Sequence, residues 1–191
     1  MDSSTCSRPV QCAQDWVEGI VCPGDTVVDA TAGNGHDSLF LAKLVGRDGF
    51  LHAFDIQEKA IESTRSLLKK NDLGGENIML HCASHSRMGE WVSPGVKAVM
   101  FNLGYLPGGD KELISREEET IPAIRMALEL TVPGGIVSVV CYPGHAGGDV
   151  EAAAVLNLLR SLGAGKWRVA ELYHGNAPSP APFLMAAFRL H

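Results

Sequence analysis

Short runs of β-branched and other apolar residues alternate with helical patterns along most of the chain. The predicted strands lie near residues 26–30, 50–55, 77–82, 97–102 and 135–141. The predicted helices lie near residues 36–46, 58–72, 115–131 and 148–163. Helix 58–72 shows the pattern best, and its apolar face carries Ala60, Ile61, Thr64, Leu67 and Leu68. Such an alternation predicts an α/β fold, with a parallel sheet and helices on both faces.

The C-terminal part of the chain departs from this alternation. Segments 167–173 and 183–190 have the composition of strands, and they are joined by the sequence HGNAPSPAP, whose three prolines predict an ordered loop instead of a crossover helix. Strands joined without a crossover pair in the antiparallel sense. We therefore predict a mostly parallel seven-stranded sheet that ends in an antiparallel strand pair. A further helix near residues 9–20 is expected to pack beside the first glycine loop.

Length and composition limit the class of protein. At 191 residues the chain is expected to form a single domain over residues 1–191, with residues 1–8 flexible. Hydrophobic residues make up 46% of the chain, and no apolar run approaches the length of a membrane helix, so no membrane attachment is expected. The five cysteines are widely spread and form no C-x-x-C pair, which predicts reduced thiols and no metal site.

The first residues lack the charged and apolar segments of a secretory signal. The expected location is therefore the cytoplasm. If a transit peptide has been removed, the alternative location is an organelle, either a chloroplast or a mitochondrion.

The charge balance bears on nucleic-acid partners. Lys and Arg total 16 against 22 Asp and Glu, which gives a net charge of −6. A protein that grips a long nucleic acid normally carries a basic surplus. We therefore expect no DNA partner, and we expect any RNA to be held over a short footprint. Arg65, Lys69 and Lys70 form the most noticeable basic run, which is interpreted as a solvated helix face.

A glycine-rich loop follows the first predicted strand in the sequence VVDATAGNGHD, residues 27–37. A strand, a glycine turn and a helix N-terminus together form an anion site, which first suggests a dinucleotide. The dinucleotide fingerprint needs a third glycine, and Ser38 stands there instead. Asp29, at the carboxyl end of the strand, would repel a pyrophosphate and attract an ammonium group. The loop therefore favours a cationic cofactor.

Two further strand ends carry residues suited to a nucleoside. The second strand ends in LHAFDIQ, so Asp55 follows Gly35 by 20 residues and can accept hydrogen bonds from both ribose hydroxyls. Gln57 either assists Asp55 or simply begins the next helix. The third strand is followed by HCASHS, in which His81 and His85 are interpreted as strand-end and loop histidines.

The fourth and fifth predicted strands end in residues that could bind an amine or a planar base. The sequence VMFNLGYLPGGD contains Asn102, whose carbonyl oxygen can accept a hydrogen bond from an amine but cannot act as a strong base. Tyr105 either stacks on a planar base or only packs. In VCYPGHAGG, Tyr142 and His145 are expected at the same sheet edge. Histidine is the usual proton acceptor near neutral pH, although a structural role for His145 is equally consistent with the sequence.

The loop DATAGNG resembles the first motif of class I S-adenosylmethionine-dependent methyltransferases. Together with AFDIQ, NLGYLPGGD and YPGHAGG, it is similar to one family long labelled as rRNA methylases. Characterised members of that family methylate 5-aminomethyl-2-thiouridine at the wobble position of tRNA. The resemblance runs from about residue 10 to the C-terminus. It implies a Rossmann-like methyltransferase fold, S-adenosylmethionine as cofactor, and a tRNA anticodon stem-loop as partner.

The resemblance also implies roles for individual residues. The cofactor-binding residues are Asp29, Ala30, Thr31, Gly33, Asn34, Gly35, His36, Asp37, Asp55, Ile56, Gln57, Ser84 and Asn102. Ser84, beside Ala83, has the place that contacts adenine. The substrate-binding residues are Tyr105, Leu106, Pro107, Tyr142, Gly144, His145 and Asn176. The catalytic residues are Asn102, Tyr105, Asp110 and His145.

The sequence departs from related patterns at two places. Leu103 and Gly104 replace the two prolines of the N-P-P-Y loop found in enzymes that methylate amino groups. The loop from Asn176 to Pro182 has a longer spacing than the family's N-x-P-P run, which leaves the role of Asn176 open. Lys111 and Arg116, which follow the sequence NLGYLPGGD, are candidates for contacts with RNA phosphates. The alternative is that both side chains are only solvated surface residues.

The implied chemistry is methyl transfer to an alkylamine. Such an amine has a pKa of about 10 and is mostly protonated at neutral pH. A nearby sulfonium and burial both favour the neutral amine. Asn102 would orient the amine, Tyr105 or Tyr142 would pack on the uracil ring, and His145 or Asp110 would accept the proton directly or through water.

Three other interpretations stay open at this point. An NAD-dependent oxidoreductase has the same fold and is opposed by Asp29 and Ser38. A cofactor-binding partner subunit without catalysis is opposed by the loops that contain Asn102 and His145. A methyltransferase that acts on rRNA or on a small amine is the third. Whether the chain forms a homodimer is also left open.

Overall fold

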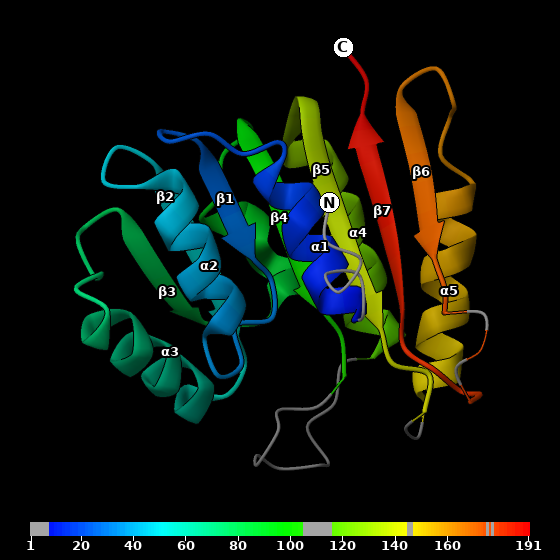
Figure 1. The fold of residues 1–191 in the computed structure, drawn as a ribbon, viewed down its shortest axis with the longest axis horizontal. Helices are drawn as coiled ribbons and strands as arrows, with labels where there is room; N and C mark the ends of the chain where they lie inside the picture. The colour runs from blue at the N-terminus through cyan, green and yellow to red at the C-terminus, as the bar shows by residue number, and fades with distance from the viewer. Residues whose placement is uncertain (1–7, 105–115, 145–146, 175, 177) are drawn as a thin grey trace.

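The computed structural model is built around one seven-stranded sheet with the strand order β3-β2-β1-β4-β5-β7-β6 (Figure 1). It describes residues 8–104, 116–144, 147–174, 176 and 178–191. The strands are β1 (Thr26–Asp29), β2 (Phe50–Asp55), β3 (Ile78–Cys82), β4 (Val96–Asn102), β5 (Thr131–Cys141), β6 (Trp167–Leu172) and β7 (Phe183–Arg189). The predicted α/β class and the number of strands are confirmed for this part of the chain.

One strand runs against all the others. β1 to β5 are parallel neighbours, whereas β7 pairs in the antiparallel sense with both β5 and β6. The predicted antiparallel pairing of the last two strands is therefore confirmed. Since β7 alone is reversed among the described strands, the carboxyl ends of β1 to β6 lie at the same edge of the sheet (Figure 1). This edge is called the carboxyl edge below.

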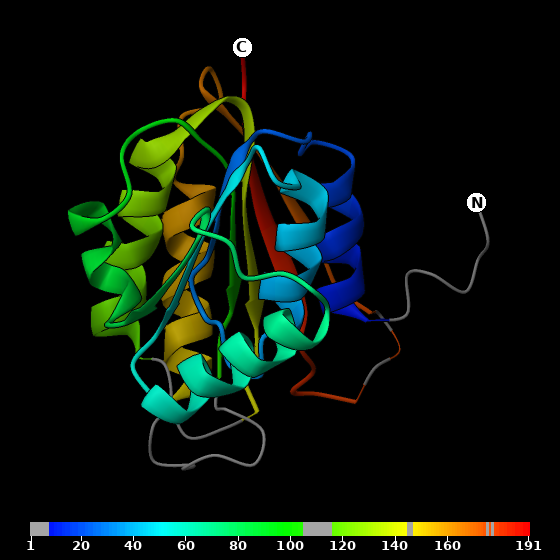
Figure 2. The ribbon, with the colours of Figure 1, turned by 90° about the vertical axis from the view of Figure 1, so that its left-hand side faces the viewer.

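Helices cover both faces of the sheet, as predicted (Figure 2). One face carries α1 (Pro9–Glu18), α2 (His36–Val45) and α3 (Glu58–Lys70). The other carries α4 (Glu117–Leu130), α5 (Gly148–Arg160) and a 3₁₀ helix, η1 (His85–Glu90). Each layer buries its own apolar cluster against the sheet, which is the arrangement that a doubly covered parallel sheet requires.

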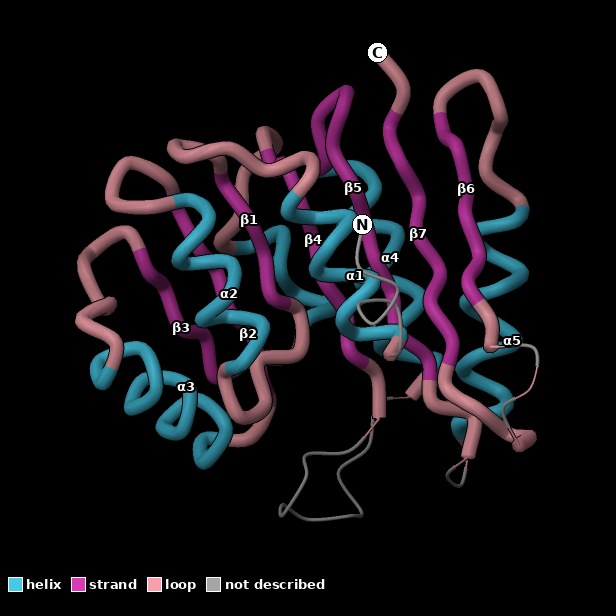
Figure 3. The backbone as a smooth tube through the Cα atoms, in the orientation of Figure 1, coloured by secondary structure: helices cyan, strands magenta, loops and turns pink. Residues whose placement is uncertain are grey.

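Two helices show how the local pattern relates to packing. The α3 face predicted from the sequence is the buried one, with Leu67 half-buried at its border. Helix α1 packs mainly on β5 and β7 and also contacts α2 (Figure 3). Its link toward the first glycine loop is Gln14, whose Nε2 donates to Asp37 Oδ1 at 2.7 Å. Helix α1 therefore reaches the start of α2, next to the glycine loop, through Gln14, and it does so on the face of the sheet that α1 and α2 share.

Two elements differ from the predicted ones. Strand β5 begins at Thr131, directly after α4, four residues before the predicted start. Its first part is irregular because Gly134 has a φ of +74°, and a Cβ on Gly135 would lie 2.7 Å from the Lys97 carbonyl oxygen. The helix η1 was not predicted, because its six residues, HSRMGE, are too few to show a helical period. Met88, fully buried, attaches η1 to the core.

Four of the five cysteines lie among the described residues, and all four are free thiols: Cys12, Cys22, Cys82 and Cys141. Cys6 lies outside the described residues. In the described part of the chain, no helix combines the length and the apolar character that crossing a membrane requires.

Candidate active site

The buried carboxylate of Asp29 lies at the end of β1, behind the glycine loop. Its side chain has no exposed surface. Ser38 Oγ donates to Oδ2 at 2.5 Å, and the Thr31 backbone N–H donates to Oδ1 at 3.1 Å. Burial and the nearby charge of Asp37 raise the pKa of Asp29 to about 7. Asp29 therefore organises the loop from behind, and Asp37 has the more accessible of the two carboxylates.

The glycine loop is fixed to two neighbouring elements. Gly35 has a φ of +85°, and a Cβ there would lie 2.8 Å from the Thr64 Cα of α3, so only glycine fits. The Gly33 N–H donates to Asp55 Oδ2 at 3.0 Å, and the Gly33 carbonyl accepts from Thr64 Oγ1 at 3.3 Å. Asn34 and His36 are exposed at the tip of the loop, and Ala30 is buried at its start. The loop is thus held open toward solvent at the carboxyl edge.

Asp55 lies at the end of β2 with its carboxylate bridging two loops. Besides the bond from Gly33, Oδ1 accepts from the Gln57 backbone N–H at 2.9 Å. Gln57 thus supports Asp55 through its backbone, and it is also the N-cap residue of α3. Ile56 is 55% exposed beside them, which is unusual for a large apolar side chain. This rim offers a fixed carboxylate and an apolar surface next to each other.

A cluster of polar side chains surrounds Asn102 at the end of β4. The Asn102 backbone N–H donates to Thr31 Oγ1 at 2.7 Å. Asp37, at the start of α2, accepts hydrogen bonds from the side chains of Asn102 and Gln14. Burial raises the pKa of Asp37, and these two bonds oppose the rise. Residues Asp37, Asn102 and Gln14 are called the amide–carboxylate cluster below.

This cluster fixes the orientation of Asn102. The hydrogen bond between Asn102 and Asp37 lowers the pKa of Asp37, so it favours the carboxylate and is donated by the Asn102 NH₂ group. The amide oxygen of Asn102 is then directed away from Asp37 and keeps its acceptor lone pairs. Tyr142, half-buried at the end of β5, is close enough for burial and the Asp37 charge to raise its pKa. The sequence indicated Asn102, Asp37 and Tyr142 but not Gln14.

The end of β3 carries a second polar group. Ser84 and Ser86 both donate their hydroxyl protons to Glu119 Oε2, and Ser84 Oγ also accepts from the Ser86 N–H at 3.2 Å. Glu119 lies in the first turn of α4 and is exposed. Sequence reasoning found Ser84 but missed Ser86 and Glu119. Three consecutive glutamates signal a helix start, but they do not reveal which one faces the site.

The two histidines near β3 have structural contacts, in agreement with their interpretation from the sequence. His85 Nδ1 hydrogen-bonds the Ala30 carbonyl oxygen at 3.0 Å, and its ring meets Phe101 edge-on. Burial lowers the pKa of His85. His81 stacks on Phe54 with ring centroids 4.5 Å apart, and Trp91 covers it at an angle. His85 therefore supports the glycine loop from the α4 side of the sheet.

Part of the predicted acceptor side cannot be compared with the structure. Tyr105, Leu106, Pro107, Asp110, Lys111 and His145 lie outside the described residues. Their roles stay predictions.

The described residues of the acceptor side lie at the ends of β4, β5 and β6. Leu103 is fully buried and donates its N–H to the Val140 carbonyl at 3.0 Å, so it continues the sheet. Gly104 has a φ of +133°. Gly144 is exposed, and a Cβ built on it would lie 3.6 Å from Pro180 Cγ, so the loop that contains Asn176 and Pro180 comes close to the end of β5. Asn176 and Arg116 are exposed.

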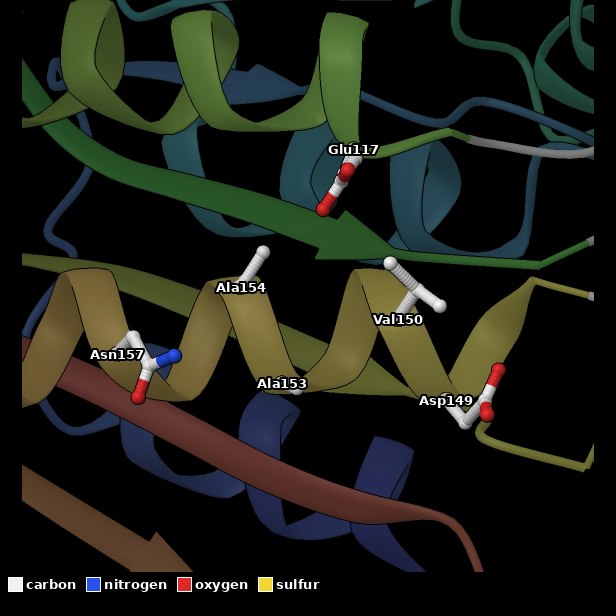
Figure 4. A pocket seen from close by; sticks show the side chains of 6 residues that line it. All are labelled: Glu117, Asp149, Val150, Ala153, Ala154 and Asn157. Atoms are coloured by element: carbon white, nitrogen blue, oxygen red, sulfur yellow. The ribbon is translucent and has the colours of Figure 1, made fainter.

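A groove of about 420 Å³ lies elsewhere, along α5 and beside the start of α4 (Figure 4). Its lining consists of Glu117, Asp149, Val150, Ala153, Ala154 and Asn157. None of the residues predicted for cofactor or substrate belongs to this lining. The candidate site is therefore defined by the polar residues of the carboxyl edge and not by this groove.

Comparison with known proteins identifies the family. The sequence matches the family described as "Putative rRNA methylase" over residues 51–187. This chain belongs to that family. It is also 40% identical over 181 residues to the "tRNA (mnm(5)s(2)U34)-methyltransferase, chloroplastic" of Arabidopsis thaliana. That match covers 90% of this chain and 66% of the plant protein, so the chain spans about two thirds of the length of that relative. The family expected from the sequence motifs is confirmed.

Solved structures agree with this membership. A "putative rRNA-methylase" from Clostridium thermocellum is 40% identical, with a TM-score of 0.93 over 97% of this chain and 100% of that one. A "putative methyltransferase" from Streptococcus mutans, solved in complex with SAH, is 31% identical, with a TM-score of 0.87 over 96% of this chain and 99% of that one. The Rossmann-like methyltransferase fold expected from the resemblance is therefore confirmed.

Proposed function

We propose that this protein transfers a methyl group from S-adenosylmethionine to the aminomethyl group of 5-aminomethyl-2-thiouridine at the wobble position of tRNA. The observation that carries the proposal is the amide–carboxylate cluster at the end of β4, which directs the Asn102 amide oxygen away from Asp37. An acceptor fixed in this way suits an amine. The family membership and the name of the Arabidopsis relative support the same reaction.

The residues of the carboxyl edge fit the cofactor. S-adenosylmethionine, when bound, supplies an electrophilic methyl group on a sulfonium, and its methionine part carries an ammonium. Asp29 and Asp37 lie beside the glycine loop with raised pKa values, and a bound cation would favour their charged forms. Asp55 provides a fixed acceptor for ribose hydroxyls, and exposed Ile56 provides an apolar surface for a planar base. The complex of the Streptococcus relative with SAH supports this cofactor.

Asn102 is proposed to orient the amine. The Asn102 amide oxygen accepts a hydrogen bond from the neutral amine and thereby aims the nitrogen lone pair at the methyl group. Burial and the like charge of a sulfonium lower the pKa of the amine, so little work is left for a base. Because methyl transfer is an in-line displacement, positioning supplies much of the acceleration. The released proton passes to solvent or to the predicted acceptors, His145 and Asp110.

A tRNA anticodon stem-loop is the proposed partner. With a net charge of −6, the protein can place few cations against phosphates, and a stem-loop is a compact target. The plant relative is named as a tRNA enzyme and as chloroplastic. Of the locations expected from the sequence, that name supports an organelle.

Nucleoside mass spectrometry tests the proposal. Purified protein and S-adenosylmethionine are incubated with tRNA that carries 5-aminomethyl-2-thiouridine. A separate incubation uses rRNA from the cells that supplied the tRNA. The expected result is conversion of the tRNA nucleoside to 5-methylaminomethyl-2-thiouridine, with no methyl group added to rRNA. Methylation of rRNA alone would replace this proposal with the rRNA alternative. The Asn102→Ala variant should abolish most of the conversion, and Asn157→Ala, an exposed amide on α5, is its matched control.

A further inference from the structure

Glu119 is an exposed carboxylate that two serines hold in one place. Ser84 and Ser86 both donate their hydroxyl protons to its Oε2 atom. A glutamate at the third position of a helix commonly bonds back to the N-cap backbone N–H. Here Oε2 instead accepts from the segment that follows β3, on a different element of the fold. The contact therefore fixes the Glu119 carboxylate at the carboxyl edge of the sheet, and its role is not limited to capping α4.

Glu119 and Asp55 both lie next to the segment that follows β3. The Ala83 N–H, next to Ser84, donates to the Asp55 backbone carbonyl at 2.9 Å. His85, which follows Ser84, is near enough to both Glu119 and Asp55 for each carboxylate to raise its pKa, against the larger effect of burial. Glu119 and Asp55 thus flank the same short segment. If Asp55 holds the ribose, the attached base extends toward Ser84 and Glu119.

The hydrogen bonds among Glu119, Ser84 and Ser86 leave one kind of interaction for a ligand. The two serine hydroxyls hydrogen-bond Glu119 and each other, and the Ser86 N–H donates to Ser84. These bonds lower the pKa of Glu119, so the group is a carboxylate at neutral pH and only accepts hydrogen bonds. A ligand that meets this cluster must therefore donate. The exocyclic amino group of adenine is such a donor, and it lies at the end of the base farthest from the ribose.

We propose that Glu119, held by Ser84 and Ser86, accepts a hydrogen bond from the exocyclic amino group of the cofactor's adenine and thereby selects adenine over hypoxanthine. This inference rests on the cofactor placement of the proposed function. Hypoxanthine carries a carbonyl oxygen where adenine carries its amino group. Two acceptors would then face each other, with one of them negatively charged, and the hydrogen bond would be replaced by repulsion.

Calorimetry with two homocysteine products tests the proposal. S-adenosylhomocysteine and its hypoxanthine analogue, S-inosylhomocysteine, are titrated separately into the protein, and the ratio of the two dissociation constants is measured. The wild-type protein should bind the adenine compound at least about tenfold more tightly, the difference expected for one charge-assisted hydrogen bond. Equal affinity for the two compounds in the wild type would overturn the proposal without any variant.

Two substitutions then assign the selectivity to the residue. In Glu119→Gln the ratio should fall by about tenfold, because the amide can donate to the hypoxanthine oxygen. Glu119→Ala should also lower the ratio, by removing the repulsion. Glu118→Gln, the exposed neighbour in the same helical turn, removes the same charge and should leave the ratio unchanged. A wild-type ratio in both Glu119 variants would overturn the proposal.

The same titrations separate this inference from the proposed function. If the wild-type protein does not bind S-adenosylhomocysteine, the proposed function fails. If the wild type binds it and Asp55→Ala weakens that binding, while both Glu119 variants keep the wild-type ratio, then the cofactor placement stands and only the role of Glu119 is overturned.

Discussion

The two ends of the candidate site differ in how they hold their carboxylates. At the methyl-transfer end, Asp29 and Asp37 are buried, and burial raises the pKa of both groups. At the nucleoside end, Asp55 is half-buried and Glu119 is exposed, with hydroxyl and backbone donors around them. Charge at the first end is therefore costly without a bound cation, whereas at the second end the hydrogen bonds from Ser84 and Ser86 lower the pKa of Glu119. We expect substitutions at the first end to change catalysis and folding, and those at the second end to change recognition.

The largest effect is expected for Asn102→Ala. Loss of the oriented amide oxygen should lower kcat by about 100-fold, the scale of a misplaced reacting group. Cofactor affinity should change far less, because Asp55 and the glycine loop remain. Single-turnover kinetics on an anticodon stem-loop with the aminomethyl group, beside calorimetry with S-adenosylhomocysteine, measure the two effects. Near-normal turnover would remove Asn102 from the mechanism even if the cofactor placement survived.

The next effect is expected at the nucleoside end. Asp55→Ala removes a fixed acceptor for the ribose and should weaken cofactor binding by at least about tenfold, or roughly 1.5–3 kcal/mol. Asp48→Ala, an exposed carboxylate just before β2, is the control and should bind normally. Unchanged affinity in Asp55→Ala, measured by calorimetry, would show that the ribose assignment is wrong.

A pH-dependent effect on stability is expected at the buried end. The pKa of Asp29 is about 7 in the folded protein against 3.8 without the fold, so the folded state keeps a proton that the unfolded state releases. This contribution to stability is present below the lower pKa and is lost as the pH rises through the higher one. Relative to Asp29→Asn, the unfolding free energy of the wild type should fall by at most about 1.4 kcal/mol per pH unit in this window.

Chemical denaturation at pH 5 and pH 8 measures that difference. Asp48→Asn is the control, because its carboxylate is exposed. A constant difference between wild type and Asp29→Asn across the two pH values would mean that Asp29 is already charged in the folded state. Saturating S-adenosylmethionine should reduce the pH dependence, because a bound cation favours the charged carboxylate.

The smallest effect is expected for Gln14→Ala. Gln14 touches Asp37 and not the reacting atoms, so its loss removes one bond to a positioning residue and should lower kcat by a few-fold, or about 1 kcal/mol. The control is Gln11→Ala on the same helix, since Gln11 bonds only the nearby Asp15 in the described contacts. A fall in kcat that is equal in both variants would point to helix stability instead of positioning.

Particular residues show how far the sequence could predict the site. The spacing between Gly35 and Asp55 predicted a carboxylate at the end of the second strand, and the structure places Asp55 there with the Gly33 N–H bonded to it. Gln14 and Glu119 were missed because they reach the site from α1 and α4, and helical periodicity predicts a buried face but not the partner. Asp29 was predicted to lie near the methionine part of the cofactor, and that stays a prediction; the sequence did not indicate that its side chain has no exposed surface.

The sequence by itself determined the order of strands and helices, the glycine loop and the family, because these features depend on residues that are neighbours in the chain. Only the tertiary structure decided which carboxylates are buried and which are exposed. That distinction follows from the packing of α1 and α2 on one face and of η1 and α4 on the other. A carboxylate's charge depends on its exposure to solvent and on its hydrogen-bond donors, and distant segments of the chain determine both.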